Sequence, residues 1–452
     1  MQEQKHQILL ATVRKLIRRG AYPNLTKALT KIHPADIAHL FRYLDLKEQR
    51  ILFNLLADAE TSAYVLSELE NDTAARLLEQ MEKESITAIL QEMAYDDAVE
   101  IIRNLPEEVA EEILHIMEDE HSEEIEELLK YGEETAGGIM ATEIFSLQEE
   151  QTASEAISAL QEAQDLEMVF YVYVTNDHGH LVGVLSLRQL LMVSPQKKLK
   201  DIMTRDVISV RTHVDQEEVA KVVEKYDLLA VPVVDERNML MGIITVDDII
   251  DVLRQEATED IYKMAGASEE ELLYGYKATK VARLRLPWLI TNLFGGVITG
   301  YLMWLFKVTL EAVIALISFI PVITGMGGNV GGQSSTIVVR GFATGKIDFS
   351  TLRHVFFKEL RVGLIMGAIC GVVIALIAYA WHGNPYLGLV VGIAMSTAIT
   401  VAACMGVLAT SFFKKIGIDP AIASSPFVQT ANDITGILIY FGTATFFINY
   451  LR

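Results

Sequence analysis

The chain has 452 residues, of which 51% are hydrophobic and 22% charged, and its formal net charge is −22. This length predicts several domains, and the mixture of apolar and charged sequence predicts membrane-embedded and soluble parts. Residues 276–452 contain 13 Lys and Arg against 5 Asp and Glu, whereas residues 1–275 contain 25 against 55. The acidic part does not fit nucleic-acid binding, which needs a basic face. It fits divalent-cation binding, or a solvated surface that aids solubility.

The first residues, MQEQKHQILLATVRKL, lack the apolar core of a secretion signal, so we expect the N-terminal half to stay in the cytoplasm. The two cysteines, Cys370 and Cys404, lie in apolar segments and show neither zinc-site spacing nor a disulfide framework. We interpret both as packing residues.

Residues 34–130 contain short helical segments with apolar faces, from PADIAHLFRYL to PEEVAEEILHIM. They recur about every 12 residues and are separated by polar residues or proline, as is typical of repeats that stack to bury each other's faces. The sequence therefore predicts an acidic α-helical solenoid as the N domain, residues 1–130. An acidic scaffold and a specific binding domain are both compatible with this pattern.

An internal repeat follows, because YVTNDHGHLVGVLSLRQLL (173–191) aligns without gaps with PVVDERNMLMGIITVDDII (232–250). Each copy predicts a strand, a turn, a second strand and a helix capped by Ser or Thr. The pair resembles tandem cystathionine-β-synthase (CBS) domains, an α/β regulatory module that often binds adenosine nucleotides. We place CBS domain 1 at 131–200 and CBS domain 2 at 201–252.

In CBS domains, the pattern Gly-x-x-Thr-x-x-Asp commonly places Thr and Asp on the ribose and phosphates of a nucleotide. The second copy has Gly242, Thr245 and Asp248, whereas Gln189 replaces the aspartate in the first copy. The resemblance therefore implies ATP or another adenosine nucleotide in one cleft, with Arg188 as an additional phosphate contact. Alternatively, the aspartate is simply an acid favoured by the dipole at a helix N-terminus.

A long helical pattern, residues 246–276, leads from the repeat to the membrane part, and we assign residues 253–280 to a connecting helix. Like charges three or four residues apart on a helix repel. The pattern is either a solvated helix or one whose charge is balanced by a divalent cation, since Mg²⁺ accepts one or two carboxylates and keeps several waters. Its acids are Asp247, Asp248, Asp251, Glu256, Glu259 and Asp260.

Residues 281–452 predict a transmembrane domain of five helices, each near the roughly 20 apolar residues that a bilayer requires. Lys and Arg gather before the first span, between the second and third, and between the fourth and fifth. The positive-inside rule then places the N-terminus in the cytoplasm and the C-terminus outside a multi-pass protein of the cell membrane. The expected spans are roughly 284–306, 308–340, 360–381, 386–413 and 426–450.

The second span is irregular, because Pro321 is followed by five glycines, with Asn329 and Gln333 among them. One interpretation is a tight helix crossing held by the two amides. The other is a kinked or broken helix that lines a polar pathway, since irregular backbone at membrane depth needs protein or water beside it.

The fifth span contains one carboxylate, Asp433, and no Lys, Arg or His. A charge in hydrocarbon is costly and points to a partner, a cavity or a cation. Gln429 lies one turn earlier on the same helix face, and Asn432 adds a further oxygen. Asp433 either forms a structural hydrogen bond or contacts a permeating ion.

The complete order of domains, together with PVITGMGGNVGGQSSTIVVRG (321–341) and GIDPAIASSPFVQTANDITGILIYF (417–441), resembles the MgtE family of magnesium channels. The resemblance implies a homodimer whose pore is lined by the second and fifth spans. Asp433 stands at the pore aspartate, which holds hydrated Mg²⁺ through water. A ring of carbonyl groups one turn earlier falls at Gln429, where the family usually has a small residue.

The resemblance also implies that the connecting helix is a plug that approaches the loop before the fifth span. Cytosolic Mg²⁺ would bridge this helix to acids of the N domain and of CBS domain 2. The expected ligands are Asp96, Asp97, Glu217, Asp227, Asp248, Asp251, Glu256, Glu259 and Asp419.

We therefore expect a multidomain α-helical membrane protein with a solenoid N domain, α/β tandem CBS domains and a five-helix transmembrane domain. The expected function is Mg²⁺ uptake by a channel or transporter that cytosolic Mg²⁺ closes. A proton- or ion-coupled carrier of Co²⁺ or Mn²⁺ and a nucleotide-responsive membrane sensor are the alternatives. An enzyme is disfavoured because no catalytic triad, zinc spacing or phosphate loop is present.

Overall fold

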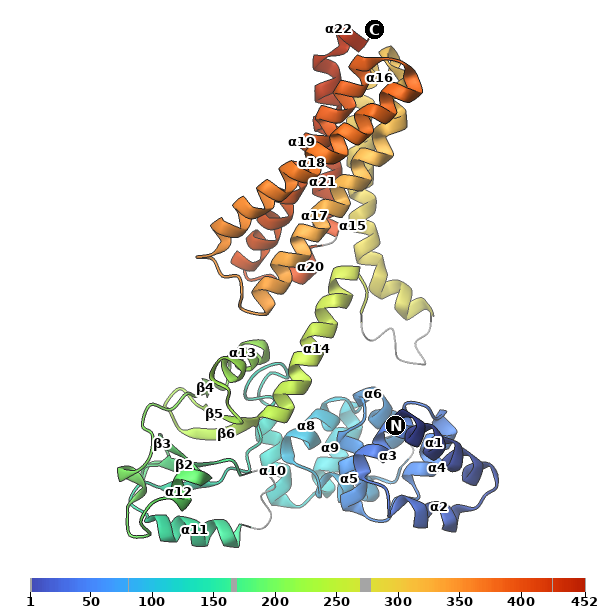
Figure 1. Cartoon of the computed structure of the whole chain (residues 1–452). Helices are drawn as coiled ribbons and strands as arrows, with labels where there is room; N and C mark the ends of the chain where they lie inside the picture. Colours follow the sequence, from blue (N-terminus) through green and yellow to red (C-terminus); the bar gives the residue numbers. More distant parts are fainter. Residues whose placement is uncertain (1, 80, 164–168, 269–277, 425, 452) are drawn as a thin grey trace. The chain divides into compact units, whose positions relative to one another are not determined.

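The computed structural model describes residues 2–79, 81–163, 169–268, 278–424 and 426–451 (Figure 1). The chain folds into two compact units, Met1–Val252 and Leu253–Arg452. In the described residues, the first unit contains ten helices followed by two small sheets with their own helices, and the second contains only helices.

The N domain is a helical solenoid, as the sequence predicts. Odd-numbered helices pack in the order α3, α5, α7 and α9, and even-numbered helices in the order α4, α6, α8 and α10, so two layers stack along one core. Several helices begin at acidic caps; for example, the backbone N–H of Glu48 donates to the Asp45 carboxylate at 2.8 Å. The helices are α1 (Gln2–Arg18), α2 (Tyr22–Leu29), α3 (Pro34–Phe41), α4 (Leu46–Phe53), α5 (Ala59–Ser67), α6 (Asn71–Leu78), α7 (Lys83–Leu90), α8 (Tyr95–Arg103), α9 (Glu107–Ile116) and α10 (Asp119–Leu128).

The sequence repeat forms two equivalent three-stranded sheets, with orders β1-β2-β3 and β4-β5-β6. In each sheet the first two strands are parallel and the last two form an antiparallel hairpin. The elements are β1 (Ser146–Gln148), α11 (Ala153–Glu162), β2 (Tyr171–Thr175), β3 (Leu181–Ser186), α12 (Leu187–Leu191), η1 (Leu199–Asp201), β4 (Val210–Arg211), α13 (Gln216–Tyr226), β5 (Ala230–Val234), β6 (Leu240–Thr245) and α14 (Val246–Ala265).

The two copies exchange the segments that precede them. Ala141 pairs with Ile243 in the second copy, and Thr204 pairs with Val184 in the first, each through reciprocal backbone hydrogen bonds of 2.8–3.0 Å. The preceding methionines lie where glycine leaves room, because a Cβ on Gly242 would collide with Met140. The equivalent glycine in the first copy contacts Met203 in the same way. These glycines are therefore explained by packing between the copies.

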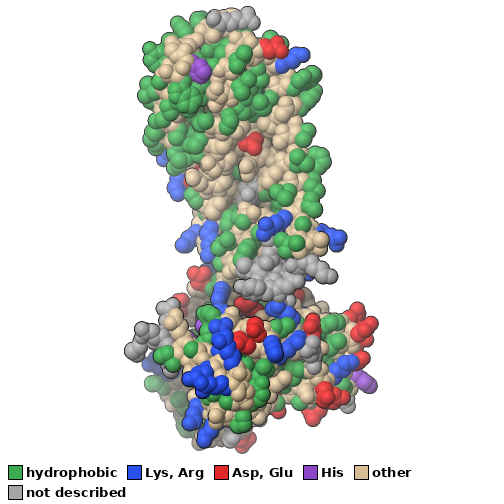
Figure 2. All heavy atoms as spheres, turned by 90° about the vertical axis from the view of Figure 1, so that its right-hand side faces the viewer, with side chains coloured by type: hydrophobic (Ala, Val, Ile, Leu, Met, Phe, Trp, Pro, Cys, Tyr) green, Lys and Arg blue, Asp and Glu red, His purple; other side chains and the backbone are tan. Residues whose placement is uncertain are grey.

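The second unit is a bundle built around α19, which packs against α17, α18 and α21 (Figure 1). Hydrophobic side chains cover much of the bundle surface in Figure 2, as expected for a surface that faces lipid. The elements are α15 (Ala278–Leu305), α16 (Lys307–Ala312), η3 (Ile314–Phe319), α17 (Ile320–Ala343), α18 (Leu352–His382), α19 (Pro385–Lys415), α20 (Pro420–Ser424), α21 (Pro426–Phe446) and α22 (Ile448–Leu451).

Four helical segments of the described residues are long and apolar enough to span a membrane: Ala278–Leu305, Ile314–Ala343, Leu352–His382 and Pro385–Lys415. The fifth predicted span is α21, which has 21 residues and packs along α15, α17 and α19. Polar residues in its first half, Asp433 among them, lower its hydropathy. The fifth helix of the bundle is therefore recognised by its packing rather than by its composition.

The second span is broken, but not at its glycines. The chain forms α16 and the 3₁₀ segment η3, and α17 then runs without interruption from Ile320 to Ala343. Pro321 lies in the first turn of α17, where its missing N–H costs no hydrogen bond. The glycine-rich stretch is therefore continuous helix that serves helix contacts, as in the interpretation of a tight crossing, and the break in the span lies before Ile320.

The glycines allow α17 to approach its neighbours closely, as small residues do in membrane bundles. A Cβ on Gly331 would collide with the side chain of Asn432, and one on Gly406 would collide with the carbonyl oxygen of Gly331. Hydroxyl groups add hydrogen bonds, such as Ser335 Oγ to Thr410 Oγ1 at 2.6 Å. The amides of Asn329 and Gln333 are exposed in one copy of the chain, so they do not hold this crossing together.

This packing predicts a contrast between neighbouring glycines. We expect Gly331→Ala to destabilise the bundle by about 1–3 kcal/mol, because the added methyl group has no space. Gly332→Ala serves as the control, since nothing lies within 4 Å of the added Cβ. Thermal unfolding in detergent should show a lower melting temperature for the first variant only. Equal stability of the two variants would contradict the packing.

Candidate functional site

A polar cavity of about 350 Å³ lies between α17 and α21 in the membrane unit. Among the described residues, no basic side chain lines it. Asp433 is half-buried there, and Asn329 and Gln429 are exposed to the cavity side. The lining residues are Pro321, Thr324, Gly325, Gly328, Asn329, Gln429 and Asp433.

The cavity is wide enough for a hydrated ion. Six waters at about 30 Å³ each occupy roughly 180 Å³, which is well below the cavity volume of about 350 Å³. Gly325 and Gly328 leave space on the α17 side of the cavity, because glycine has no side chain to fill it. One carboxylate with two neutral amides can therefore contact the water shell of a cation rather than the ion itself.

Two predicted pore residues lie elsewhere. Asn432 is 1% exposed and points toward Gly331, away from the cavity. Neither polar atom of its amide has a hydrogen-bond partner within the described part of the chain. Gln333 lines a separate cavity of about 400 Å³ between α17, α18 and α19, to which Asn329 also contributes.

The first unit contains a larger cavity, of about 730 Å³, between the N domain and the CBS domains. Three of the predicted cation ligands line it: Asp96 and Asp97 come from the first turn of α8, and Asp248 comes from the first turn of α14. No Lys, Arg or His is among the described residues that line it. Its carboxylates are Glu60, Glu68, Glu92, Asp96, Asp97, Glu143, Asp247 and Asp248.

The crowding of these acids changes their protonation. Burial, followed by the charge of Asp96, raises the pKa of Asp248 to about 7. Burial also raises the pKa of Asp97, and the neighbouring Asp96 and Asp248 raise it further. A cavity that destabilises its own negative charges in this way is a favourable place for a divalent cation.

These pKa values predict a pH dependence of stability in Mg²⁺-free buffer. Asp248 has a higher pKa in the folded protein than its unperturbed value of 3.8, so the unfolded chain ionises first as the pH rises. Stability should therefore fall from about pH 4 to about pH 7. We expect the melting temperature to drop over this range, and we expect Mg²⁺ or Asp248→Asn to reduce the drop. A pH profile that neither change alters would contradict the assignment.

The same cavity presents part of the predicted nucleotide site. The Thr245 hydroxyl donates to Asp248 Oδ2 at 2.5 Å, and the aromatic side chains of Phe170, Tyr171 and Tyr173 line the cavity. Arg188 is exposed on α12 and is not among the lining residues. Gly242 is buried beneath Met140 and does not line the cavity either.

The first CBS copy differs from the second at residue 189, where the nucleotide-binding pattern has aspartate. Gln189, which replaces the aspartate, accepts a hydrogen bond from the backbone N–H of Ser186 at 2.9 Å. The Ser186 hydroxyl in turn accepts from the backbone N–H of Gln189. Gln189 therefore completes a capping box at the start of α12.

The remaining predicted cation ligands are dispersed. Glu217 pairs with Lys221 at 3.3 Å on α13, and Asp227 is exposed at the end of that helix with a left-handed backbone, φ 50°. Asp251 is exposed and Glu256 half-buried on α14. Among the described residues, no three His, Cys, Asp or Glu side chains form a compact metal-binding group.

A lysine joins two of the predicted ligands within the second unit. Lys263 Nζ lies 2.5 Å from Glu259 Oε1 and 2.8 Å from Asp419 Oδ2. Partial burial opposes its charge, but the hydrogen bonds to Asp419 and Glu259 outweigh burial and raise the pKa of Lys263. In this conformation, Lys263 therefore supplies the positive charge beside Glu259 and Asp419 that the sequence leads us to expect from Mg²⁺. Sequence reasoning missed this role because the partners are 156 positions apart.

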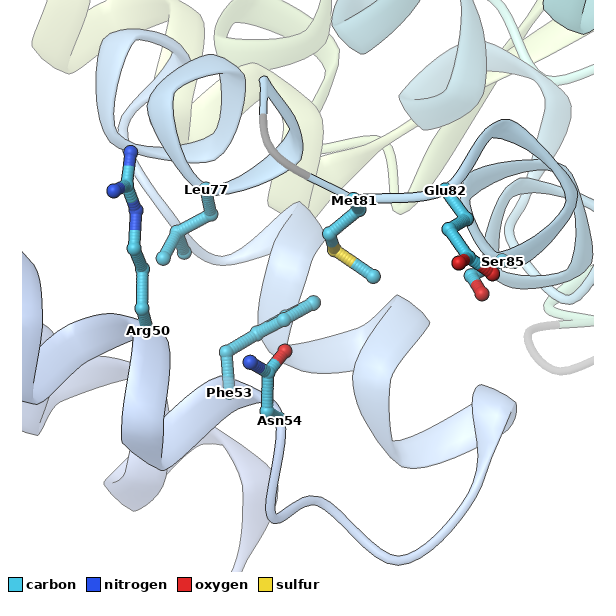
Figure 3. Close-up of a pocket in the computed structure, with 7 residues that line it drawn as sticks. All are labelled: Arg50, Phe53, Asn54, Leu77, Met81, Glu82 and Ser85. Atoms are coloured by element: carbon cyan, nitrogen blue, oxygen red, sulfur yellow. The ribbon is translucent and has the colours of Figure 1, made fainter.

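A further cavity of about 250 Å³ lies in the solenoid between α4, α6 and α7 (Figure 3). Arg50 and Glu82 stand on opposite sides of it, and Asn54 and Ser85 add neutral polar groups. Because its charges have opposite signs, this cavity does not share the cation-attracting character of the acidic one.

Family models match most of the chain. The model described as "Divalent cation transporter" (MgtE) matches residues 320–443, and the model of the MgtE intracellular N domain matches 32–134. The CBS domain model matches 136–195 and 199–255. These matches confirm the resemblance inferred from the sequence, and with it the tandem CBS module.

Named relatives and solved structures agree with these models. The chain is 42% identical to magnesium transporter MgtE of Bacillus subtilis, over 72% of each chain. It is 41% identical to the protein of the same name from Thermus thermophilus, over 71% of each chain.

Two crystal structures, of the soluble part of a magnesium transporter and of the cytosolic domain of the Mg²⁺ channel MgtE with ATP, are 34% identical and have TM-scores of 0.51. They cover 56% and 54% of this chain, respectively, and 99% of their own chains. The protein belongs to the MgtE family of divalent cation transporters.

Proposed function

We propose that the protein is a Mg²⁺ channel or transporter for magnesium uptake, and that the ion passes the cavity between α17 and α21. The observation that carries this proposal is Asp433, a half-buried carboxylate in a polar cavity between two helices of the bundle. An acid at membrane depth needs a compensating partner, and a passing cation provides one. The names of the relatives support Mg²⁺ as the ion.

Selectivity would arise from recognition of the hydrated ion. Mg²⁺ releases its waters reluctantly, so a wide polar cavity can bind it through water where a tight ring of direct ligands would be too slow. Asn329 and the Gln429 amide can accept or donate hydrogen bonds to these waters.

Two copies of the chain would complete the pathway. One copy supplies a single carboxylate, whereas two facing Asp433 side chains would balance the double charge of Mg²⁺. The homodimer is therefore part of the proposal. The predicted orientation, with the N-terminus in the cytoplasm and the C-terminus outside, is a further part and follows from the distribution of Lys and Arg.

Cytosolic Mg²⁺ would close the pathway by binding the acidic cavity of Asp96, Asp97 and Asp248. When Mg²⁺ is scarce, repulsion among these carboxylates favours a more open arrangement of the cytosolic domains. When Mg²⁺ is abundant, the ion binds the closed arrangement more tightly and shifts the population toward it. The other acids expected on α13, on α14 and before α21 would act as weaker sites: Glu217, Asp227, Asp251, Glu256, Glu259 and Asp419.

We also propose that CBS domain 2 binds ATP or a related adenosine nucleotide. Thr245 and Asp248 face the cavity, aromatic side chains line it, and a relative that is 34% identical was solved with ATP. Asp248 belongs to both proposed sites, so nucleotide and Mg²⁺ would influence each other there. Calorimetric titration of the full-length protein with ATP, with and without Mg²⁺, tests the nucleotide site.

Uptake into proteoliposomes distinguishes transport from the alternatives. We expect Mg²⁺ entry that follows the Mg²⁺ gradient and does not change when a proton gradient is imposed or collapsed. Entry that tracks the proton gradient would favour a coupled carrier. No entry of any divalent cation, despite intact ATP binding, would favour a nucleotide-responsive sensor and overturn the proposal.

A further inference from the structure

The first 31 residues reverse the charge of the cytosolic half. They carry seven Lys and Arg against one Glu, whereas residues 32–275 carry 18 Lys and Arg against 54 Asp and Glu. This basic segment precedes residues 32–134, which the N-domain family model matches. It therefore lies outside the part of the N domain that the family model matches.

The basic segment is folded and anchored. Val13 and Ile17 of α1 and Leu25 and Leu29 of α2 are buried in the solenoid core. Because these side chains are buried, the opposite side of each helix is exposed to solvent. The cationic face, as we call it here, consists of the exposed side chains of Lys15, Arg18, Arg19, Lys27 and Lys31.

Ion pairs among the described residues leave this face unneutralised. Arg14, at its edge, pairs with Glu48 at 3.6 Å. In contrast, the five side chains of the cationic face have no ion-pair partner among the described residues whose side chains are placed. Five exposed cations on an acidic domain, without ion-pair partners in the described part of the chain, indicate an anionic partner outside the domain.

An exposed apolar side chain accompanies these cations. Ile8 of α1 is 68% exposed. Residues spaced by seven and four positions share a helix face, so Ile8 lies on the same side of α1 as Lys15 and Arg19. A folded basic helix with an exposed apolar residue on its cationic side is the arrangement that binds the surface of an anionic bilayer. The bilayer surface offers both anionic headgroups for the cations and an apolar layer for Ile8.

We propose that the cationic face of α1 and α2 binds anionic phospholipid headgroups. Because other helices of the same chain are embedded in a bilayer, that bilayer is present at a high effective concentration. A basic residue near an anionic membrane surface strengthens binding by about fivefold, so a few of the five suffice for binding in cis. This inference is independent of which cation the membrane unit transports.

Hydrogen exchange of the full-length protein in lipid nanodiscs tests the proposal. We compare discs of phosphatidylcholine with discs of equimolar phosphatidylcholine and phosphatidylglycerol. We expect amides of residues 6–31 to exchange at least about fivefold more slowly in the anionic discs, and the difference to disappear at high salt.

Two charge-reversal variants sharpen the test. Lys15→Glu/Arg18→Glu/Arg19→Glu should lose the lipid-dependent protection, whereas Lys197→Glu/Arg205→Glu/Lys225→Glu, which changes the charge equally at other exposed positions, should keep it. Unchanged melting temperatures would show that both variants fold. Equal exchange in both lipids would overturn the proposal. So would protection that rises with protein concentration in phosphatidylcholine discs, which would identify an acidic surface of a second copy as the partner.

Discussion

Replacing Asp433 with asparagine should reduce Mg²⁺ flux by about a hundredfold or more while the bundle still folds. The variant keeps the size of the side chain in the α17–α21 cavity and removes only its charge. A full charge within the membrane represents about 3 kcal/mol, which corresponds to roughly a hundredfold in occupancy. Flux of Mg²⁺ into proteoliposomes, at equal protein content, measures the effect.

Asp348→Asn provides the matched control, because Asp348 is exposed in the loop between α17 and α18 and not in the cavity. We expect this control to retain flux within about twofold. If Asp433→Asn retained selective flux equal to that of the parent protein, Asp433 would have a structural role, and the pathway would lie elsewhere.

The double substitution Asp97→Asn/Asp248→Asn should make the protein nearly insensitive to cytosolic Mg²⁺. Both side chains line the acidic cavity, and each loses a charge that would attract the ion. A hydrogen bond to a charged group contributes about 1.5–3 kcal/mol, so each substitution should weaken Mg²⁺ binding there by roughly tenfold or more. We expect the half-closing Mg²⁺ concentration in membrane patches to rise accordingly, with the open-state current unchanged.

Glu162→Gln/Glu224→Gln controls for the change in net charge, since both residues are exposed and neither lines the cavity. This control should close at the same Mg²⁺ concentration as the parent protein. A similar shift in both double variants would mean that the acidic surface acts only through its overall charge. No shift in either variant would remove the cavity from the gating mechanism.

Much of the fold could be predicted because local patterns determine it. The internal repeat predicted the two equivalent sheets, and the i, i+4 spacing of Gln429 and Asp433 predicted that they face one cavity. Helix geometry also explains Asn432: it is next to Asp433 in sequence, about 100° around the helix. Asn432 is therefore buried against Gly331 instead of facing the cavity. The prediction of Asn432 as a pore residue did not take this angle into account.

Other features depend on contacts that no local pattern contains. The bridge from Lys263 to Asp419 joins distant parts of the chain. Glu143 lines the acidic cavity because each CBS copy pairs with the segment that precedes the other copy. Secondary-structure propensities and the spacing of hydrophobic residues do not specify this exchange. The position of the break before α17 is another such feature, because glycine usually weakens a helix and the break nevertheless precedes the glycine-rich stretch. Here close packing with α19 and α21 stabilises the glycine-rich helix instead.

The most direct measurement is a patch recording of the parent protein with Mg²⁺ as the only permeant cation outside, while the cytosolic Mg²⁺ concentration is raised in steps. We predict an inward Mg²⁺ current that decreases as cytosolic Mg²⁺ increases and recovers when Mg²⁺ is removed. A current that is absent, or that remains constant over the whole range of cytosolic Mg²⁺, would contradict the proposed link between the pore and the acidic cavity.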